Sequence, residues 1–375
     1  MLRVARYTLA AASITLTLAG CQDASAPGDA ARALSTTPLM SHALRELAPL
    51  DSHVVRADLT DPAITFGAGL ASAEHYVWLD LSARENTKLL VFMPGARGRP
   101  FAWKLVQKEA ARLGYHVIGL MYQNDVPVDS VCKGKPDRDC SGNLRMEIID
   151  GIDRSTLTVV TPANGIDNRL TKLLAYLAQQ FPDEGWSRFL KDGGPKWSQI
   201  AVAGQSQGGA QAALIGRLRH VDRVVMFSAP PDARVPQEVD PWIFIGATPA
   251  AKYFALFHQR DHLVAGIRAN LTALDMDRFG VPVMAELNES PYNETHILTT
   301  DLEPQGLPPQ IGIDMRPHQS TARDDRTPLE LDGVTPKLLG AWRYLLGDRE
   351  VEEEVADEGA ERDETTAGPG GATRH

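Results

Sequence analysis

Short apolar runs alternate with longer amphipathic segments along most of the chain. Strand-like runs of four to six residues occupy positions 88–93, 116–121, 200–203, 223–227, 253–258 and 295–300. Apolar residues at helical spacing occupy positions 101–113, 164–180, 207–219, 266–274 and 335–346. This alternation predicts an α/β fold with a mostly parallel central sheet and helices on both faces. Two earlier runs, 53–59 and 75–81, predict an antiparallel pair of strands.

The most specific part of this pattern is the turn that follows the run 200–203. It reads Gly204-Gln205-Ser206-Gln207-Gly208 and leads into an alanine- and leucine-rich helix. Strand, G-x-S-x-G and helix together predict a nucleophile elbow at Ser206, because only glycine fits where so sharp a turn brings backbones together. An ordinary glycine-rich loop is the alternative, and the flanking strand and helix favour the elbow.

With this elbow, the alternating pattern resembles the α/β-hydrolase fold over about residues 39–346. The stretches LLVFMPGARGRPFAW, GYHVIGLMYQND and PHQSTARDDRTP are similar to a little-characterised bacterial branch of secreted hydrolases. The resemblance implies a catalytic triad in the chain order nucleophile, acid, histidine. Ser206 is then the nucleophile.

The triad acid is expected just after a later strand. Asp261 follows the run 253–258 closely and is the preferred candidate, although it could instead cap the helix that follows. Asp232, Asp240 and Asp301 are weaker alternatives, because none directly follows so clear a strand at that point of the chain.

The triad base is expected in the loop after the last strand, where His318 lies. His296 begins that strand, so we expect it to be packed or exposed there. His262 directly follows the proposed acid, and adjacent residues rarely face each other across a site. A solvated loop histidine is the alternative interpretation of His318.

Acyl transfer also needs two backbone donors for the oxyanion. One is the N–H of Gln207, the residue after the nucleophile. The other is expected in the loop after the run 88–93, from Gly95 or Ala96, although PGARG departs from the H-G-G type of many esterases.

The N-terminus resembles a bacterial lipoprotein signal. Arg3 and Arg6 precede an apolar stretch, and Leu18-Ala19-Gly20-Cys21 resembles the lipoprotein processing box. We therefore expect a signal peptide over 1–20, a lipid on Cys21, and a flexible tether over 21–38. The expected location is the bacterial cell envelope, with the outer membrane favoured. A plain secretory signal is the alternative.

Two further cysteines, Cys132 and Cys140, lie in a long polar segment over 122–161. An oxidising compartment permits a disulfide between them, with two free thiols as the alternative. Because this segment follows a strand next to the elbow strand, we expect it to form a loop or cap that overhangs the site. It interrupts one hydrolase domain over 39–347.

Charge excludes some classes of function. The net charge is -10, and the tail 348–375 carries ten acidic and three basic residues, a net of -7, which predicts disorder. Nothing resembles a nucleic-acid-binding surface, a nucleotide-binding loop or a metal cluster, so neither cofactor nor metal is expected.

The sequence thus predicts a lipid-anchored, extracytoplasmic serine hydrolase that acts on small or polymeric carboxylic esters through an acyl-enzyme. A non-catalytic binding lipoprotein on the same scaffold remains an alternative. A peptidase or amidase with the same triad is another, since fold alone separates none of these.

Overall fold

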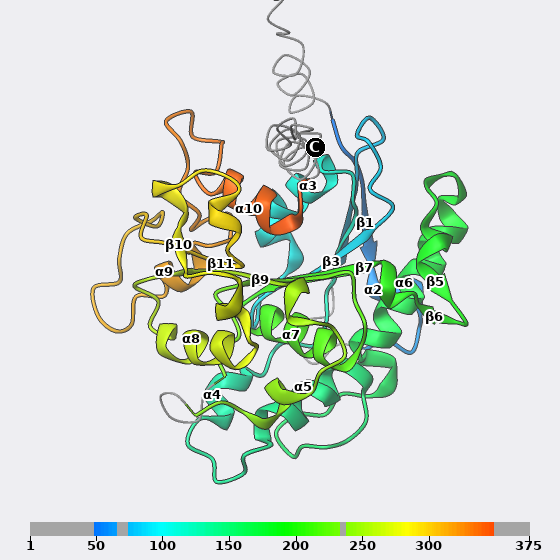
Figure 1. Ribbon diagram of the computed structural model, residues 1–375. Coiled ribbons are helices and arrows are strands. Elements are labelled where there is room, and N and C mark those ends of the chain that lie inside the picture. The colour runs from blue at the N-terminus through cyan, green and yellow to red at the C-terminus, as the bar shows by residue number, and fades with distance from the viewer. Residues whose placement is uncertain (1–48, 66–73, 233–237, 349–375) are drawn as a thin grey trace, which may run out of the picture. The chain divides into compact units, whose positions relative to one another are not determined.

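A nine-stranded sheet organises the chain in the computed structural model, which describes residues 49–65, 74–232 and 238–348 (Figure 1). The strand order is β1-β2-β4-β3-β7-β8-β9-β11-β10. The strands are β1 (Asp51–Arg56), β2 (Glu74–Leu79), β3 (Leu89–Met93), β4 (His116–Gly119), β7 (Ile200–Gln205), β8 (Arg223–Phe227), β9 (Tyr253–His258), β10 (Val283–Met284) and β11 (Ile297–Thr300). A separate hairpin pairs β5 (Leu190–Lys191) with β6 (Gly194–Pro195).

Strand direction divides this sheet into two parts. From β4 to β10 every neighbouring pair is parallel. The edge strand β1 is antiparallel to its neighbour β2, as predicted, and β2 is also antiparallel to β4. The sheet corrects one expectation. The strand that precedes residues 122–161, β4, is not next to the elbow strand β7, because β3 lies between them.

The α-helices cover both faces of the sheet (Figure 1). They are α2 (Ala57–Thr60), α3 (Lys104–Arg112), α4 (Val128–Cys132), α5 (Cys140–Asp150), α6 (Ile166–Gln180), α7 (Gln207–Leu218), α8 (Val264–Ala273), α9 (Arg316–Gln319) and α10 (Leu339–Leu346). Helices α5 to α8 pack on one face, and α3 and α10 pack on the other.

Each central strand serves both cores because its side chains alternate between the faces. In β3, Val91 and Met93 join the core under α6 and α7, whereas Leu90 and Phe92 join the core under α3 and α10. All five residues of β3 are buried, which explains why the strand reads as a continuous apolar run. The predicted α/β-hydrolase architecture is confirmed: a mostly parallel sheet with helices on both faces.

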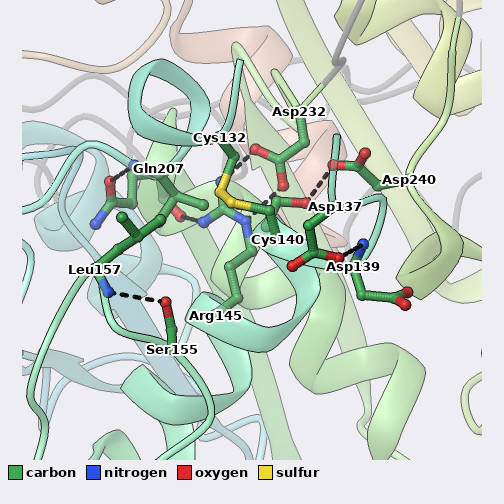
Figure 2. Close-up of a disulfide and its surroundings, with 12 residues drawn as sticks. Cys132, Asp137, Asp139, Cys140, Arg145, Ser155, Leu157, Gln207, Asp232 and Asp240 are labelled. Carbon is green, nitrogen blue, oxygen red and sulfur yellow. Dashed lines mark hydrogen bonds and ion pairs between the residues drawn. A yellow bond between two sulfur atoms is a disulfide. The ribbon is translucent and has the colours of Figure 1, made fainter. Parts of the chain in front are cut away.

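The segment 122–161, which we expected to form a loop or cap, is partly helical. It contains α4 and α5, and α5 is largely buried against α6 and α7. A disulfide joins Cys132 at the end of α4 to Cys140 at the start of α5, with 5.7 Å between their Cα atoms (Figure 2). The predicted pairing is therefore confirmed. Sequence reasoning missed α5 because its apolar residues are interleaved with buried polar ones.

One predicted helix was too long: the helix expected from Thr335 begins only at Leu339. Residues 186–189 form a separate 3-10 helix after α6, which ends at Gln180.

The predicted signal peptide, the lipidated Cys21, the tether and most of the acidic tail lie outside the described residues, so these stay predictions. Among the helices that are described, none combines the length and the hydrophobicity needed to cross a bilayer.

Candidate active site

Ser206 lies in a strained turn between β7 and α7. Its backbone has φ 56° and ψ -119°, a region that L-residues occupy at a cost of about 1–3 kcal/mol. A Cβ on Gly204 would lie 2.4 Å from the backbone of Gly208, and one on Gly208 would lie 2.0 Å from the carbonyl oxygen of Met93. The two motif glycines are thus required by close backbone contact, as the pattern predicted.

A chain of two hydrogen bonds connects Ser206 with the predicted acid and base. His318 Nε2 lies 2.7 Å from Ser206 Oγ, and His318 Nδ1 lies 2.7 Å from Asp261 Oδ2. Asp261 is 2% exposed and His318 is 3% exposed, whereas Ser206 is partly exposed. The structure therefore brings together all three residues named from the sequence, although they are up to 112 positions apart in the chain.

The two oxygens of Asp261 have different partners. Oδ2 bonds His318, and Oδ1 accepts the backbone N–H of Leu263 at 2.8 Å, just before α8 begins. Asp261 does not cap α8, which has no side-chain cap; its Oδ1 instead closes a local turn on the N–H of Leu263, and its Oδ2 faces the base. The bond from Leu263 fixes the carboxylate so that its second oxygen faces the imidazole.

The alternative acids are engaged elsewhere. Asp232 forms a fully buried bidentate ion pair with Arg145. Asp240 accepts a hydrogen bond from the hydroxyl of buried Ser141, and Asp301 pairs with Arg260 at the surface.

The alternative histidines differ from each other. His296 is packed between the rings of Phe254 and Phe279, and burial lowers its pKa to about 4. His262 lies closer to the site than adjacency in sequence suggested. Its Nδ1 is 3.5 Å from Asp261 Oδ1, its ring meets that of His318 edge-on at 5.4 Å, and burial lowers its pKa.

Asp261, His262 and His318 could also present three ligand atoms to a metal ion, since those atoms lie within 4.8 Å of one another. Both ring nitrogens of His318 are, however, already engaged by Ser206 and Asp261. A metal would have to displace one of those bonds. The arrangement fits a proton relay better than a ligand set.

Sequence reasoning missed the side chains that hold the His318 segment, 316–327. Gln205 Nε2 donates to the carbonyl oxygen of His318 at 2.9 Å, which ties this segment to the residue before the nucleophile. Trp342 Nε1 donates to the carbonyl of Thr321 at 2.9 Å, and Thr327 Oγ1 donates to that of Ser320 at 3.0 Å. The only available signal in the sequence was the pair Ser320 and Thr321 shortly after His318, whose carbonyls accept two of these bonds.

The predicted oxyanion loop lies beside Ser206. A Cβ on Gly95 would be 3.5 Å from the Cβ of Ser206. Buried Asn124 holds this loop, because its Nδ2 donates to the carbonyls of Gly95 and Gly98, each at 2.9 Å. The N–H of Ala96 belongs to the same trans peptide as the Gly95 carbonyl and so points away from Asn124. Within the described chain it has no hydrogen-bond acceptor.

Gln207, the other predicted donor, is the first residue of α7, so its N–H has no partner within the helix. Its side chain and its carbonyl are held by residues of the segment 122–161. Gln207 Oε1 accepts the N–H of Val128 at 3.1 Å, and its carbonyl accepts from Arg145 at 3.3 Å. Figure 2 shows Arg145 between Asp232 and Gln207, next to the disulfide. The disulfide-closed segment thus supports the elbow, and its expected role as a cap over the site stays a prediction.

No family model matches this chain, and no curated protein matches it, so its membership of the secreted hydrolase branch stays a prediction. Similar solved structures include esterase B from Lactobacillus rhamnosis with a tributyrin phosphonate, at 14% identity and a TM-score of 0.38, covering 84% of this chain and 95% of that one.

A bacterial heroin esterase is similar at 15% identity and a TM-score of 0.33, covering 70% of this chain and 78% of that one. Carboxyl esterase 2 from the fungus Tuber melanosporum is similar at 8% identity and a TM-score of 0.34, covering 68% and 76%. Likenesses this distant assign no activity to the present chain, which has to be inferred from the geometry of its site.

Proposed function

We propose that this protein is a serine hydrolase that cleaves carboxylic esters through an acyl-enzyme. The observation that supports this most is the hydrogen-bonded chain from Ser206 through His318 to Asp261, at 2.7 Å for each bond. A serine on a strained turn, within reach of an imidazole that a buried carboxylate orients, is the arrangement that nucleophilic acyl transfer requires.

In the proposed reaction, Ser206 Oγ adds to the ester carbonyl carbon while its proton passes to His318 Nε2. His318 then gives that proton to the leaving alkoxide as the C–O bond breaks, so the alcohol departs and an acyl-serine remains. Water repeats the sequence and releases the acid. Asp261 accepts the Nδ1 hydrogen throughout and stabilises the imidazolium.

The charge that develops on the carbonyl oxygen needs the two backbone donors. We assign them to the N–H of Gln207 and to that of Ala96, with Gly95 as the alternative. Loss of one such donor typically raises the barrier by about 3 kcal/mol.

The test combines a fluorophosphonate probe with turnover of 4-nitrophenyl butyrate. Ser206→Ala and His318→Ala should each lose labelling and lower kcat by about 10⁴ or more. Ser82→Ala and His220→Ala change an exposed serine and an exposed histidine and serve as matched controls. Undiminished turnover by folded Ser206→Ala protein would refute the proposal. A folded protein that neither labels nor turns over would favour the binding-module alternative.

We also propose that the enzyme works outside the cytoplasm. The support is the Cys132–Cys140 disulfide, because such bonds persist mainly in oxidising compartments. Fractionation of bacteria that express the full chain should recover it with the envelope, and recovery in the cytosol with both thiols reduced would contradict this.

A further inference from the structure

We infer that the proposed active site is built for esters that carry an anionic group, held by arginines in a pocket beside the oxyanion loop. This inference rests on the proposed function and names its substrate class. The pocket has a volume of about 490 Å³ and is lined by residues of β2, of the loop after β3, of the turn before α3 and of the His318 segment.

The pocket lies along the loop that contacts the reacting serine, although Ser206 is not itself one of its lining residues. Ala96 and Arg97 form part of its wall, and Gly95, directly before them, would bring a Cβ within 3.5 Å of Ser206 Cβ. Its far wall comes from Glu74 and Tyr76 on β2. Three strand spacings, or roughly 14 Å, separate β2 from β7. A substrate can therefore place its carbonyl at Ser206 and extend a second group into the pocket.

The lining is strongly basic for a protein whose net charge is -10. Arg97, Arg99 and Arg323 face one carboxylate, that of Glu74. Arg323 is paired with Asp325 at 2.7 Å, and Glu74 accepts the hydroxyl of Tyr76 at 3.0 Å.

Two of these arginines have guanidinium N–H groups that bind no carboxylate among the described residues. Among the residues that the structure describes, the Arg97 side chain donates only to the backbone carbonyl of Asp125, at 3.3 Å, and Arg99 makes no ion pair. A guanidinium presents a planar fork that matches a carboxylate or a phosphate group. The pair Arg97 and Arg99 therefore brings more positive charge to the pocket than the single carboxylate of Glu74 neutralises.

Aromatic rings complete the pocket. Tyr76 and Phe101 lie 5.5 Å apart, and Phe101 is 51% exposed although it is apolar. Lys104 lies 4.2 Å above the Phe101 ring, where it is also paired with Asp324 at 4.0 Å. An anionic ester with a short apolar spacer matches this combination of rings and guanidinium groups.

The experiment compares matched ester pairs that differ only in a terminal charge. For the acyl side the pair is 4-nitrophenyl hydrogen adipate and 4-nitrophenyl hexanoate. For the alcohol side it is the butyrate esters of 4-hydroxyphenylacetate and 4-ethylphenol. In at least one pair the wild-type protein should prefer the anionic member by about tenfold in kcat/KM, since each exposed ion pair contributes modestly.

The double variant Arg97→Gln/Arg99→Gln should abolish that preference, and added salt should weaken it. Arg278→Gln, which changes an exposed arginine paired with Asp275, is the matched control and should leave the ratio unchanged. Equal turnover of both members in both pairs would overturn the inference while leaving the proposed function intact. So would a preference that survives the double variant.

If no ester is turned over, the proposed function fails and binding decides the inference. Calorimetry with Ser206→Ala protein would then compare monomethyl adipate with methyl hexanoate. Binding of the anionic ester alone, lost in the arginine double variant, would support the pocket. Absence of binding would refute it.

Discussion

The elbow at Ser206 and the His318 segment meet in one site, yet they are held in different ways. Ser206 is positioned by its immediate neighbours in sequence, because Gly204 and Gly208 allow one tight turn between β7 and α7. His318 lies on the short helix α9 and is positioned by side chains from distant elements, above all Gln205 and Trp342. A local turn can be recognised in the sequence, whereas the contacts that hold a distant segment cannot.

The largest effect should come from breaking the local turn. In Gly208→Ala the new Cβ would lie 2.0 Å from the Met93 carbonyl, which is rigid backbone. We expect a loss of about 3 kcal/mol in the free energy of unfolding and at least about a hundredfold loss in kcat, because the nucleophile is misplaced. Urea unfolding and ester kinetics measure both quantities.

Gly194→Ala is the control for this variant, since no atom lies within 4 Å of its added Cβ. A Gly208→Ala protein with normal stability and activity would show that the turn tolerates a side chain and that the steric argument is wrong.

A smaller effect should come from removing the hydrogen bond that connects the elbow with the His318 segment. Gln205→Leu removes the donor to the His318 carbonyl and leaves that buried oxygen without this bond. We expect kcat to fall about tenfold and the free energy of unfolding to fall by about 1 kcal/mol. Gln259→Leu, at the end of β9, changes a glutamine whose bond to Thr299 is partly exposed, and should do neither. Unchanged kcat in Gln205→Leu would mean that the other contacts suffice to hold His318.

The smallest effect concerns a histidine outside both regions. The pKa of His296 is lowered from 6.5 to about 4, so its neutral form is favoured in the folded state. Its contribution to stability is complete above about pH 6.5 and is lost as the pH falls towards 4, because the unfolded chain takes up the proton first.

His296→Phe keeps an aromatic ring between Phe254 and Phe279 and removes this titration. Stability measured by urea unfolding should then fall less steeply between pH 6.5 and 4, by under about 1 kcal/mol for a partly buried group. An unchanged dependence of stability on pH would mean that another group causes the loss of stability in acid. Fully buried His75, whose pKa is lowered to about 3, is then the next residue to test.

The same contrast explains which features of the fold and of the site could be predicted from the sequence. The fold was predictable because β3, β7, β8 and β9 are buried apolar runs, and most of the segments between them carry apolar residues at helical spacing. Asp261 and His318 were predictable from their order along the chain and from the strands before them. The roles of Gln205 and Asn124 were not, since a polar residue at a strand end has many possible partners until the tertiary structure selects one.

The reversed direction of β2 has a further consequence. Because β2 runs against β4, its first residues lie at the sheet edge where the parallel strands end. One wall of the pocket is therefore encoded near position 75, about 130 residues before the nucleophile in the chain. Exchange of that wall leaves the turn at Ser206 and the bonds to His318 untouched. If the pocket binds the substrate as we propose, substrate preference can be redesigned, or can diverge among descendants, independently of the bond-breaking chemistry.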